Sequence, residues 1–148
     1  MSQNEFERDF SHEVLKTFGL AHNYNQWIFD MMKPYVGKNI LEVGCGTGNM
    51  TFFLKNCGKL TCLDRSESYM EHTRIDNPGV AFLNADIADP SLPRTIGKKF
   101  DTITCINVLE HIKDDERALM NMKDMLEKNG RLLLFVPALS ALYGSLDQ

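Results

Sequence analysis

Apolar side chains recur at helical spacing over the first part of the chain. From residue 6 to residue 18 they repeat every four positions and Gly19 follows them, so the pattern predicts a first helix that ends there. From residue 24 to residue 35 they repeat every three or four positions and predict a second helix that runs to about residue 36. These two helices precede every segment that carries candidate chemistry.

From Lys38 onward the pattern changes to short apolar runs separated by more polar, helical stretches. The apolar runs predict strands at 39–43, 59–64, 80–86, 100–108 and 131–136. Helices are predicted from an N-cap at Thr47 to about Asn56, from an N-cap at Ser66 to Asn77, and from Asp114 to Glu127. The Pro-containing stretch 89–97 is predicted as a connection. Strands that alternate with helices indicate an α/β fold with a parallel sheet covered on both faces.

The composition is typical of one soluble globular domain. The 148 residues are 43% hydrophobic and 24% charged, with a net charge of −4. This balance provides no global basic field, which disfavours nucleic acid as the partner. The longest apolar run, 132–139, contains Pro137 and is too short to span a membrane, and the N-terminal segment has no apolar signal core. We therefore expect a soluble, cytoplasmic protein.

Neither the cysteines nor the acidic residues predict a metal site. Cys45, Cys57, Cys62 and Cys105 form no CxxC pair and have no closely spaced histidines beside them. Each lies in or beside an apolar segment, so we expect buried free thiols in a reducing compartment. The acids at 114–116 are expected to stabilise a helix N-terminus rather than to bind a metal.

Three glycines, Gly44, Gly46 and Gly48, follow the first predicted strand directly. Alternating glycines at such a point indicate that the backbone comes close to a ligand or to a neighbouring helix. The dinucleotide fingerprint GxGxxG requires its third glycine at position 49, where the sequence has Asn49. A P-loop requires Lys-Ser or Lys-Thr after Gly48, and the sequence has Asn49 and Met50. Both phosphate-binding motifs are therefore incomplete.

Acidic residues accompany the ends of three successive strands. Glu42 lies two residues before Gly44, Asp64 ends the second strand, and Asp86 ends the third. Ligands of open α/β sheets bind outside the carboxyl ends of the strands, and an acid about 20 residues after the glycine turn can bind a ribose diol. A ligand with ammonium, ribose and adenine amino groups would use all three acids. For Glu42, capping of the next helix is the alternative role.

The stretch from residue 40 to residue 136 resembles the class I S-adenosylmethionine (SAM)-dependent methyltransferases. ILEVGCGTG is similar to their first motif, LDRS to the acidic end of their second strand, and NADI to their adenine-contacting segment. FDTITCINVLEHI is similar to the fourth-strand motif of the small-molecule branch (types 11 and 12), and GRLLLFVP to the fifth strand. The resemblance implies a Rossmann-like doubly wound parallel sheet of strand order 3-2-1-4-5. The chain is then one SAM-binding domain, 1–148, with a helical lid at 1–37 and the Rossmann-like core at 38–148.

The resemblance also implies which residues bind the cofactor. Glu42 meets the methionine ammonium, Asp64 binds the ribose hydroxyls, and Asn107 approaches the methionine end. The backbone of Gly44, Cys45, Gly46 and Gly48 lies against the cofactor. Arg65 lies beside the adenine, and Asp86 and Ile87 hold its amino edge.

For two further candidate side chains, a structural role is an alternative to the functional one. HNYNQW (22–27) resembles a segment that some of these enzymes fold over the cofactor, which makes Tyr24 a candidate contact, whereas simple core packing explains Tyr24 and Trp27 too. His111 follows the fourth strand on the expected active-site side and is a candidate general base. Capping or orienting the next helix is the alternative role of His111.

The predicted function is methyl transfer from SAM to an oxygen, nitrogen or carbon nucleophile of a small molecule, lipid or sugar. One alternative is a SAM-binding, methyltransferase-like module without turnover. A second is an NAD-type oxidoreductase, which Asn49 disfavours.

Length is the main departure from the family pattern. A full class I domain usually continues past the fifth strand with a helix and two more strands, whereas this sequence ends at SLDQ, 145–148. We therefore expect a fragment that lacks the last two strands, with the fifth strand exposed at a sheet edge. A homodimer through this edge, or a continuation of the chain, would cover it.

Overall fold

A single five-stranded sheet organises the protein. The computed structural model describes residues 22–137, so the helix predicted at 6–18 lies outside the described residues. The strands are β1 (Asn39–Val43), β2 (Lys59–Asp64), β3 (Ala81–Asn84), β4 (Phe100–Ile106) and β5 (Leu126–Phe135). All are parallel, in the order β3-β2-β1-β4-β5, which confirms the predicted strand order. The order reverses between β1 and β4, where α/β sheets bind their ligands.

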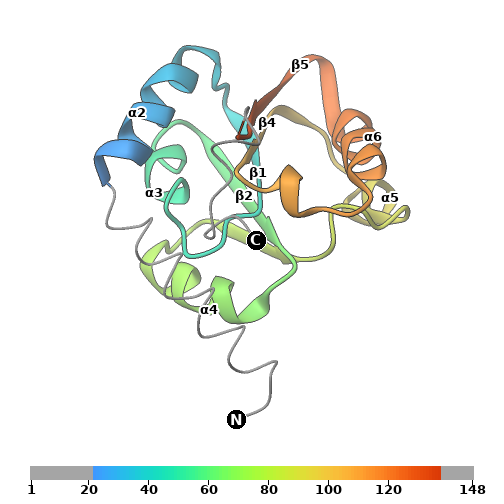
Figure 1. Ribbon diagram of the computed structural model, residues 1–148, viewed down its shortest axis with the longest axis horizontal. Coiled ribbons are helices and arrows are strands. Elements are labelled where there is room, and N and C mark those ends of the chain that lie inside the picture. Colours follow the sequence, from blue (N-terminus) through green and yellow to red (C-terminus); the bar gives the residue numbers. More distant parts are fainter. Residues whose placement is uncertain (1–21, 138–148) are drawn as a thin grey trace.

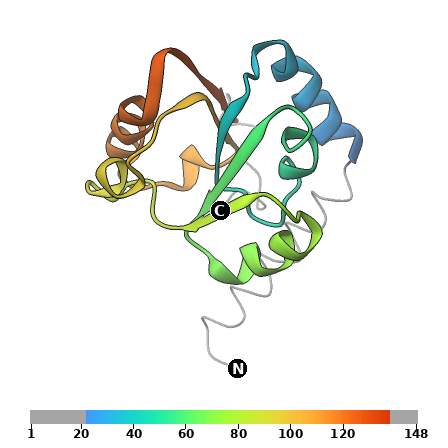
Figure 2. The ribbon, with the colours of Figure 1, turned by 180° about the vertical axis from the view of Figure 1, so that it is seen from behind.

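Helices cover both faces of the sheet (Figure 1), and the view from behind shows the same two layers (Figure 2). One layer contains α2 (His22–Met32), η1 (Lys33–Tyr35), α3 (Thr51–Leu54) and α4 (Glu67–Asp76). The other contains α5 (Leu92–Ile96) and α6 (Asp115–Met125), and the short η2 (Leu109–His111) follows β4. Each layer has its own buried apolar cluster, so the sheet separates two half-cores.

The alternation of side chains along β1 places one carboxylate in an apolar layer. Leu41 and Val43 point into the cluster beneath α6, whereas Ile40 points into the cluster beneath α2 and α3. Glu42 shares the face of Ile40 and is only 4% exposed. A buried carboxyl at an otherwise apolar position is costly, and such positions are commonly functional.

The predicted helix start at Thr47 is wrong. Helix α3 begins at Thr51, with Met50 as its N-cap residue, and ends at Leu54 rather than near residue 56. Gly46 and Gly48 both have positive φ, so the loop cannot enter a right-handed helix before residue 49. The predicted cap at Ser66 is correct in position, but the Ser66 hydroxyl contacts the Ser68 hydroxyl instead of a helix N–H.

Other elements also differ from the prediction, among them β4, which ends at Ile106 rather than at residue 108. Strand β3 ends at Asn84, because Asp86 starts a turn in which its carboxylate accepts a hydrogen bond from the N–H of Ala88. The stretch predicted as a connection contains helix α5. Helix α6 ends at Met125, and β5 then begins at Leu126 with an irregular register opposite Phe100 and Thr102.

Burial corrects two further expectations. Trp27 is 52% exposed, with its ring edge against Phe135, so it is not a core residue. Cys45, Cys62 and Cys105 are buried free thiols as predicted, whereas Cys57 is only half-buried. Among residues 22–137, none of the helices has the length and apolarity needed to cross a membrane.

Candidate active site

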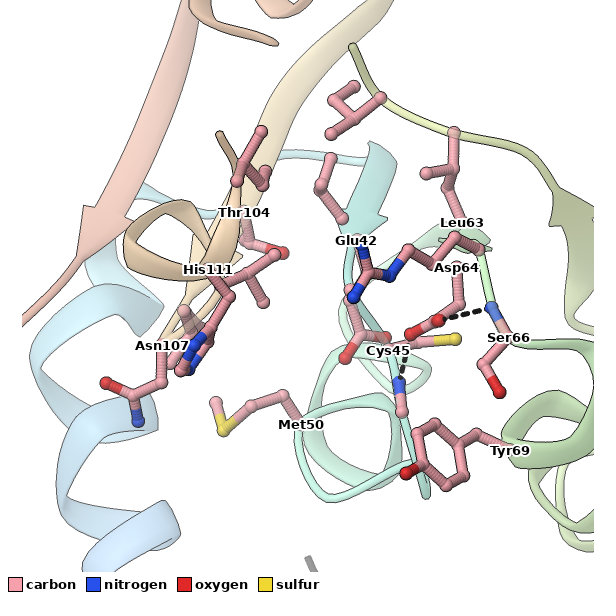
Figure 3. Close-up of a pocket in the computed structure, with 18 of the residues that line it drawn as sticks. Glu42, Cys45, Met50, Leu63, Asp64, Ser66, Tyr69, Thr104, Asn107 and His111 are labelled. Carbon is pink, nitrogen blue, oxygen red and sulfur yellow. Dashed lines mark hydrogen bonds between the residues drawn. The ribbon is translucent and has the colours of Figure 1, made fainter. Parts of the chain in front are cut away.

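A cavity of about 550 Å³ opens at the carboxyl edge of the sheet, over the point where the strand order reverses. Its volume is within the usual range of ligand pockets, roughly 300–1,000 Å³. Figure 3 shows Asn107 and His111 on one side of the cavity, Asp64, Ser66 and Tyr69 on the other, and Glu42 and Cys45 between them. The predicted site residues that line it are Tyr24, Glu42, Gly44, Cys45, Gly46, Asp64, Arg65, Asp86, Ile87, Asn107 and His111.

The three glycines of the loop after β1 have different roles. A Cβ on Gly44 would lie 2.3 Å from Cγ2 of Val108, so this glycine lets the loop approach the turn after β4. A Cβ on Gly48 would lie 2.7 Å from Cγ2 of Thr73, so this glycine permits packing against α4. Gly48 is not among the cavity-lining residues. Gly46 has nothing within 4 Å of its Cβ position, which leaves backbone accessible to a ligand.

Asp64 holds this loop in place from the end of β2. Its Oδ2 accepts a hydrogen bond from the N–H of Gly46 at 2.8 Å, and its Oδ1 accepts one from the N–H of Ser66 at 2.8 Å. The hydroxyl of Thr73 donates to the carbonyl of Gly46 at 2.9 Å and fixes the next peptide of the loop. A carboxylate has about four lone-pair sites, so Asp64 retains capacity to accept hydrogen bonds from a ligand.

Glu42 lies at the floor of the cavity with an unusual protonation equilibrium. Its Oε2 accepts hydrogen bonds from the hydroxyl of Thr51 at 2.6 Å and from the thiol of Cys62 at 3.3 Å. Burial raises the pKa of Glu42 to about 7, although these hydrogen bonds act in the opposite direction. Because Thr51 is the first residue of α3, Glu42 supports the start of that helix as well as facing the cavity.

The segment after β3 closes the cavity on the side of β2 and β3. Asp86 and Ile87 line it there, and Ile87 is buried. The side-chain amide of Asn121, on α6, donates to the carbonyls of Ile87 at 2.7 Å and Asp89 at 2.8 Å. Asn121 therefore fixes the backbone beside both cavity-lining residues. On the sequence, Asn121 is one polar residue in an amphipathic helix, and nothing indicates this contact.

The turn after β4 forms the opposite side of the cavity. Asn107 has a φ of 52°, a left-handed conformation that asparagine tolerates better than most residues, and its N–H donates to the carbonyl of Phe135 at 2.8 Å. His111 follows in η2, lines the cavity and is exposed. Tyr24 reaches the cavity from α2 and is 37% exposed. This exposure corrects the core-packing alternative for Tyr24.

The lining also includes residues that were not predicted as site residues from the sequence, among them Asn25, Asn49, Met50, Tyr69, Thr104 and Glu110. Two of them carry buried side-chain oxygens without a hydrogen-bond partner, Oγ1 of Thr104 and Oε2 of Glu110. Thr104 had no separate signal, because β4 also contains Thr102, and Glu110 had none beside His111. Among residues 22–137, no three His, Cys, Asp or Glu side chains are placed to hold a metal ion.

A family model described as "Methyltransferase domain" matches residues 41–132, which is more than half of the chain. The protein therefore belongs to the class I SAM-dependent methyltransferase family, as the resemblance predicted. This membership also removes support from the NAD-type alternative.

Individual relatives resemble only part of a longer protein. The chain is 29% identical to the mitochondrial ubiquinone biosynthesis O-methyltransferase of Schizosaccharomyces pombe, over 86% of this chain and 53% of the relative. It is 30% identical to the tRNA U34 carboxymethyltransferase of Campylobacter hominis, over 82% and 45% respectively. The chain thus spans about half the length of the curated relatives it matches.

Solved structures support the same fold. SAM-bound CalS10, an amino pentose methyltransferase from Micromonospora echinaspora, matches with a TM-score of 0.71 and 20% identity, over 86% of this chain and 56% of that chain. DesVI from Streptomyces venezuelae matches with a TM-score of 0.69 and 22% identity, over 88% and 58% respectively. At these identities the likeness establishes the fold alone.

Proposed function

We propose that this chain forms the cofactor-binding core of a SAM-dependent methyltransferase that modifies a small molecule, lipid or sugar. The observation that carries the proposal is the buried carboxyl of Glu42 beside the open backbone of Gly46, at the edge where the strand order reverses. Membership of the methyltransferase family supports it independently.

The lining of the cavity fits a cationic adenosyl ligand better than a dinucleotide. Its carboxylates are Glu42, Asp64, Asp86, Glu110 and Asp114, and its basic side chains besides His111 are Arg65 and Lys113. A pyrophosphate would meet an excess of negative charge, whereas an ammonium and a sulfonium would be attracted. The volume of about 550 Å³ accommodates a nucleoside with an amino-acid tail.

The predicted contacts are consistent with this geometry and remain proposals. Glu42 and Asn107 would hold the methionine end, with the backbone of Gly44, Cys45 and Gly46 along the middle. Asp64 would accept from the ribose hydroxyls, and Arg65, Asp86 and Ile87 would surround the adenine. Gly48 would act indirectly, by letting the loop pack against Thr73. In the lid proposed at 1–37, Tyr24 and Asn25 line the cavity.

The bound cofactor would supply a methyl group already activated by its sulfonium. The remaining task of the protein is to align an acceptor, and alignment alone can lower a barrier by about 7–11 kcal/mol. His111, in the turn after β4, is our candidate to remove the acceptor proton, an effect typically worth about 10²–10⁴-fold in rate. Its place on the cavity wall supports this role.

A binding module without turnover is the second candidate, because the chain spans only about half of its curated relatives. In the described sheet β5 is an edge strand. Leu134 in it and Val136 directly after it are exposed, which supports the proposal that a second copy or further chain pairs there.

Two measurements on the 148-residue chain separate these candidates. Calorimetry with SAM and with S-adenosylhomocysteine reports cofactor binding, and transfer of a labelled methyl group from SAM to pooled small-molecule, lipid and sugar fractions reports turnover. Binding with transfer supports the enzyme; binding without transfer to any fraction favours the module. If neither nucleoside binds, the proposal fails.

A further inference from the structure

Two buried oxygens in the cavity lack a hydrogen-bond partner. Among residues 22–137, the buried side-chain N and O atoms in this condition are Oγ1 of Thr104 and Oε2 of Glu110. Thr104 is fully buried, and both residues line the cavity. Native proteins satisfy most buried polar atoms, so an unsatisfied one that faces a cavity indicates a missing ligand or water. Each of the two oxygens therefore indicates a point at which a ligand or water supplies a polar group.

Both atoms belong to the β4 side of the cavity. Thr104 lies in β4 directly beside Glu42 of β1, and Glu110 lies in η2, the turn that follows β4. The residues assigned to ribose and adenine, Asp64 and Asp86, follow β2 and β3 on the opposite side. A cofactor with its adenosine over β2 and β3 and its methionine end at Glu42 therefore directs its methyl group toward the β4 side.

The charge of the β4 side suits an amine. Four of the five lining carboxylates have a role: Glu42, Asp64 and Asp86 are assigned to the cofactor, and Asp114 is the N-cap of α6, where it accepts from the N–H of Arg117. Glu110 is the remaining carboxylate. Two causes raise the pKa of the Cys105 thiol to about 12, burial of the thiol first and the nearby carboxylate of Glu110 second. Glu110 therefore acts electrostatically on the end of β4. A carboxylate oxygen can only accept hydrogen bonds, so its partner must be a donor.

We infer that the β4 side of the cavity is the acceptor subsite, that it binds a small molecule through an amine, and that Glu110 is the residue that holds this amine beside the methyl position. This inference rests on the proposed function and specifies its substrate class. The hydroxyl of Thr104, beside Glu42, is a second polar group on this side of the cavity. An acceptor with an anionic group at this point is disfavoured, because it would meet the unpaired carboxylate of Glu110.

Sinefungin and S-adenosylhomocysteine form a matched pair of probes. Sinefungin carries an amine-bearing carbon where SAM carries its methylated sulfur, whereas S-adenosylhomocysteine has nothing at this point. The extra affinity of sinefungin therefore reports how well the protein binds an amine at the methyl position. Glu110→Gln removes the charge without changing the shape of the side chain.

Calorimetry of both ligands on the 148-residue chain tests the inference. We expect the wild type to bind sinefungin at least about tenfold more tightly than S-adenosylhomocysteine, as a charge-assisted hydrogen bond would produce. Glu110→Gln should reduce this ratio to within about twofold and leave the affinity for S-adenosylhomocysteine unchanged. Asp114→Asn is the control, since it removes another cavity carboxylate but keeps a good helix cap, and it should retain the wild-type ratio.

The outcomes are distinguishable. If both ligands bind and Glu110→Gln keeps the wild-type ratio, or if Asp114→Asn lowers the ratio equally, the amine subsite is wrong while the proposed function stands. If neither ligand binds the wild type, the proposed function fails and the inference fails with it. Glu110→Ala replaces Glu110→Gln if the latter does not fold, with the same expected loss of preference.

Discussion

The carboxylate of Asp64 and the backbone N–H of Gly46 are joined by a 2.8 Å hydrogen bond. Asp64 ends β2 and Gly46 lies in the loop after β1, so one bond connects the carboxyl ends of two neighbouring strands. Asp64 also accepts from the N–H of Ser66, at the start of α4. The acid predicted to bind ribose thus also shapes the glycine loop.

Replacement of Asp64 should therefore affect binding and stability together. Asp64→Ala leaves the N–H groups of Gly46 and Ser66 without their acceptor, and each hydrogen bond to a charged group is worth about 1.5–3 kcal/mol. We expect SAM affinity to fall by about 100-fold or more, with a clear decrease in Tm, measured by calorimetry and thermal unfolding. Glu71→Ala, an exposed acid on α4, is the control. Wild-type SAM affinity in Asp64→Ala would exclude the ribose role.

The glycine loop allows stability and binding to be separated. Gly44→Ala places a Cβ 2.3 Å from Val108 in addition to the cost of its positive φ, so it should destabilise the fold by several kcal/mol, about the cost of overpacking plus a left-handed residue. Gly46→Ala meets no atom and should cost only about 1–2 kcal/mol. SAM affinity should nevertheless fall strongly in Gly46→Ala, because the new methyl group enters the cavity. Retained SAM affinity there would mean that the loop does not contact the cofactor.

Glu42 should make stability fall as pH rises. Its pKa is about 7 in the folded protein and ordinarily 4.5, so the folded state holds the proton more tightly than the unfolded chain. The proton therefore stabilises the fold below about pH 4.5, and this contribution is lost as pH rises through about 7, in total roughly 3 kcal/mol.

The neutral variant Glu42→Gln removes this dependence. We expect it to raise Tm relative to wild type at about pH 8 and to change it little at about pH 4.5, since Gln resembles the protonated acid. SAM affinity should fall in the same variant, because the ammonium loses its counter-charge. Tm and calorimetry at the two pH values test both effects; an equal change in Tm at both would contradict the burial account.

His111→Ala tests the general base. The side chain is exposed on the cavity wall, so its removal should leave Tm and SAM affinity unchanged. Methyl transfer to an acceptor should slow by about 10²–10⁴-fold. His72→Ala, an exposed histidine on α4, is the control. An unchanged rate in His111→Ala would make the base assignment wrong.

The sequence predicted the features that depend on local pattern and missed those that depend on packing. The predicted strands 39–43 and 59–64 have the same first and last residues as β1 and β2, because apolar runs bounded by turns define them. Glu42 and Asp64 stand out as acids at strand ends, a property visible along the chain. The late start of α3 at Thr51 depends on the φ angles of the glycine loop, which spacing alone does not determine.

Thr104, Glu110 and Asn121 show the limit more clearly. Whether the oxygens of Thr104 and Glu110 have partners depends on every side chain around them, and that is decided by tertiary contacts. Asn121 reaches the backbone at Ile87, 34 residues away in sequence. Such residues have ordinary polar identities, so only the folded arrangement distinguishes them from surface positions.

The cavity over β1 and β4 is the site that we propose for SAM. Calorimetric titration of the 148-residue chain with SAM and, in parallel, with NAD is the decisive measurement. We predict saturable binding of SAM with one site per chain, weakened about 100-fold or more by Asp64→Ala, and no binding of NAD. Binding of NAD without binding of SAM would show that the cavity is not a SAM site.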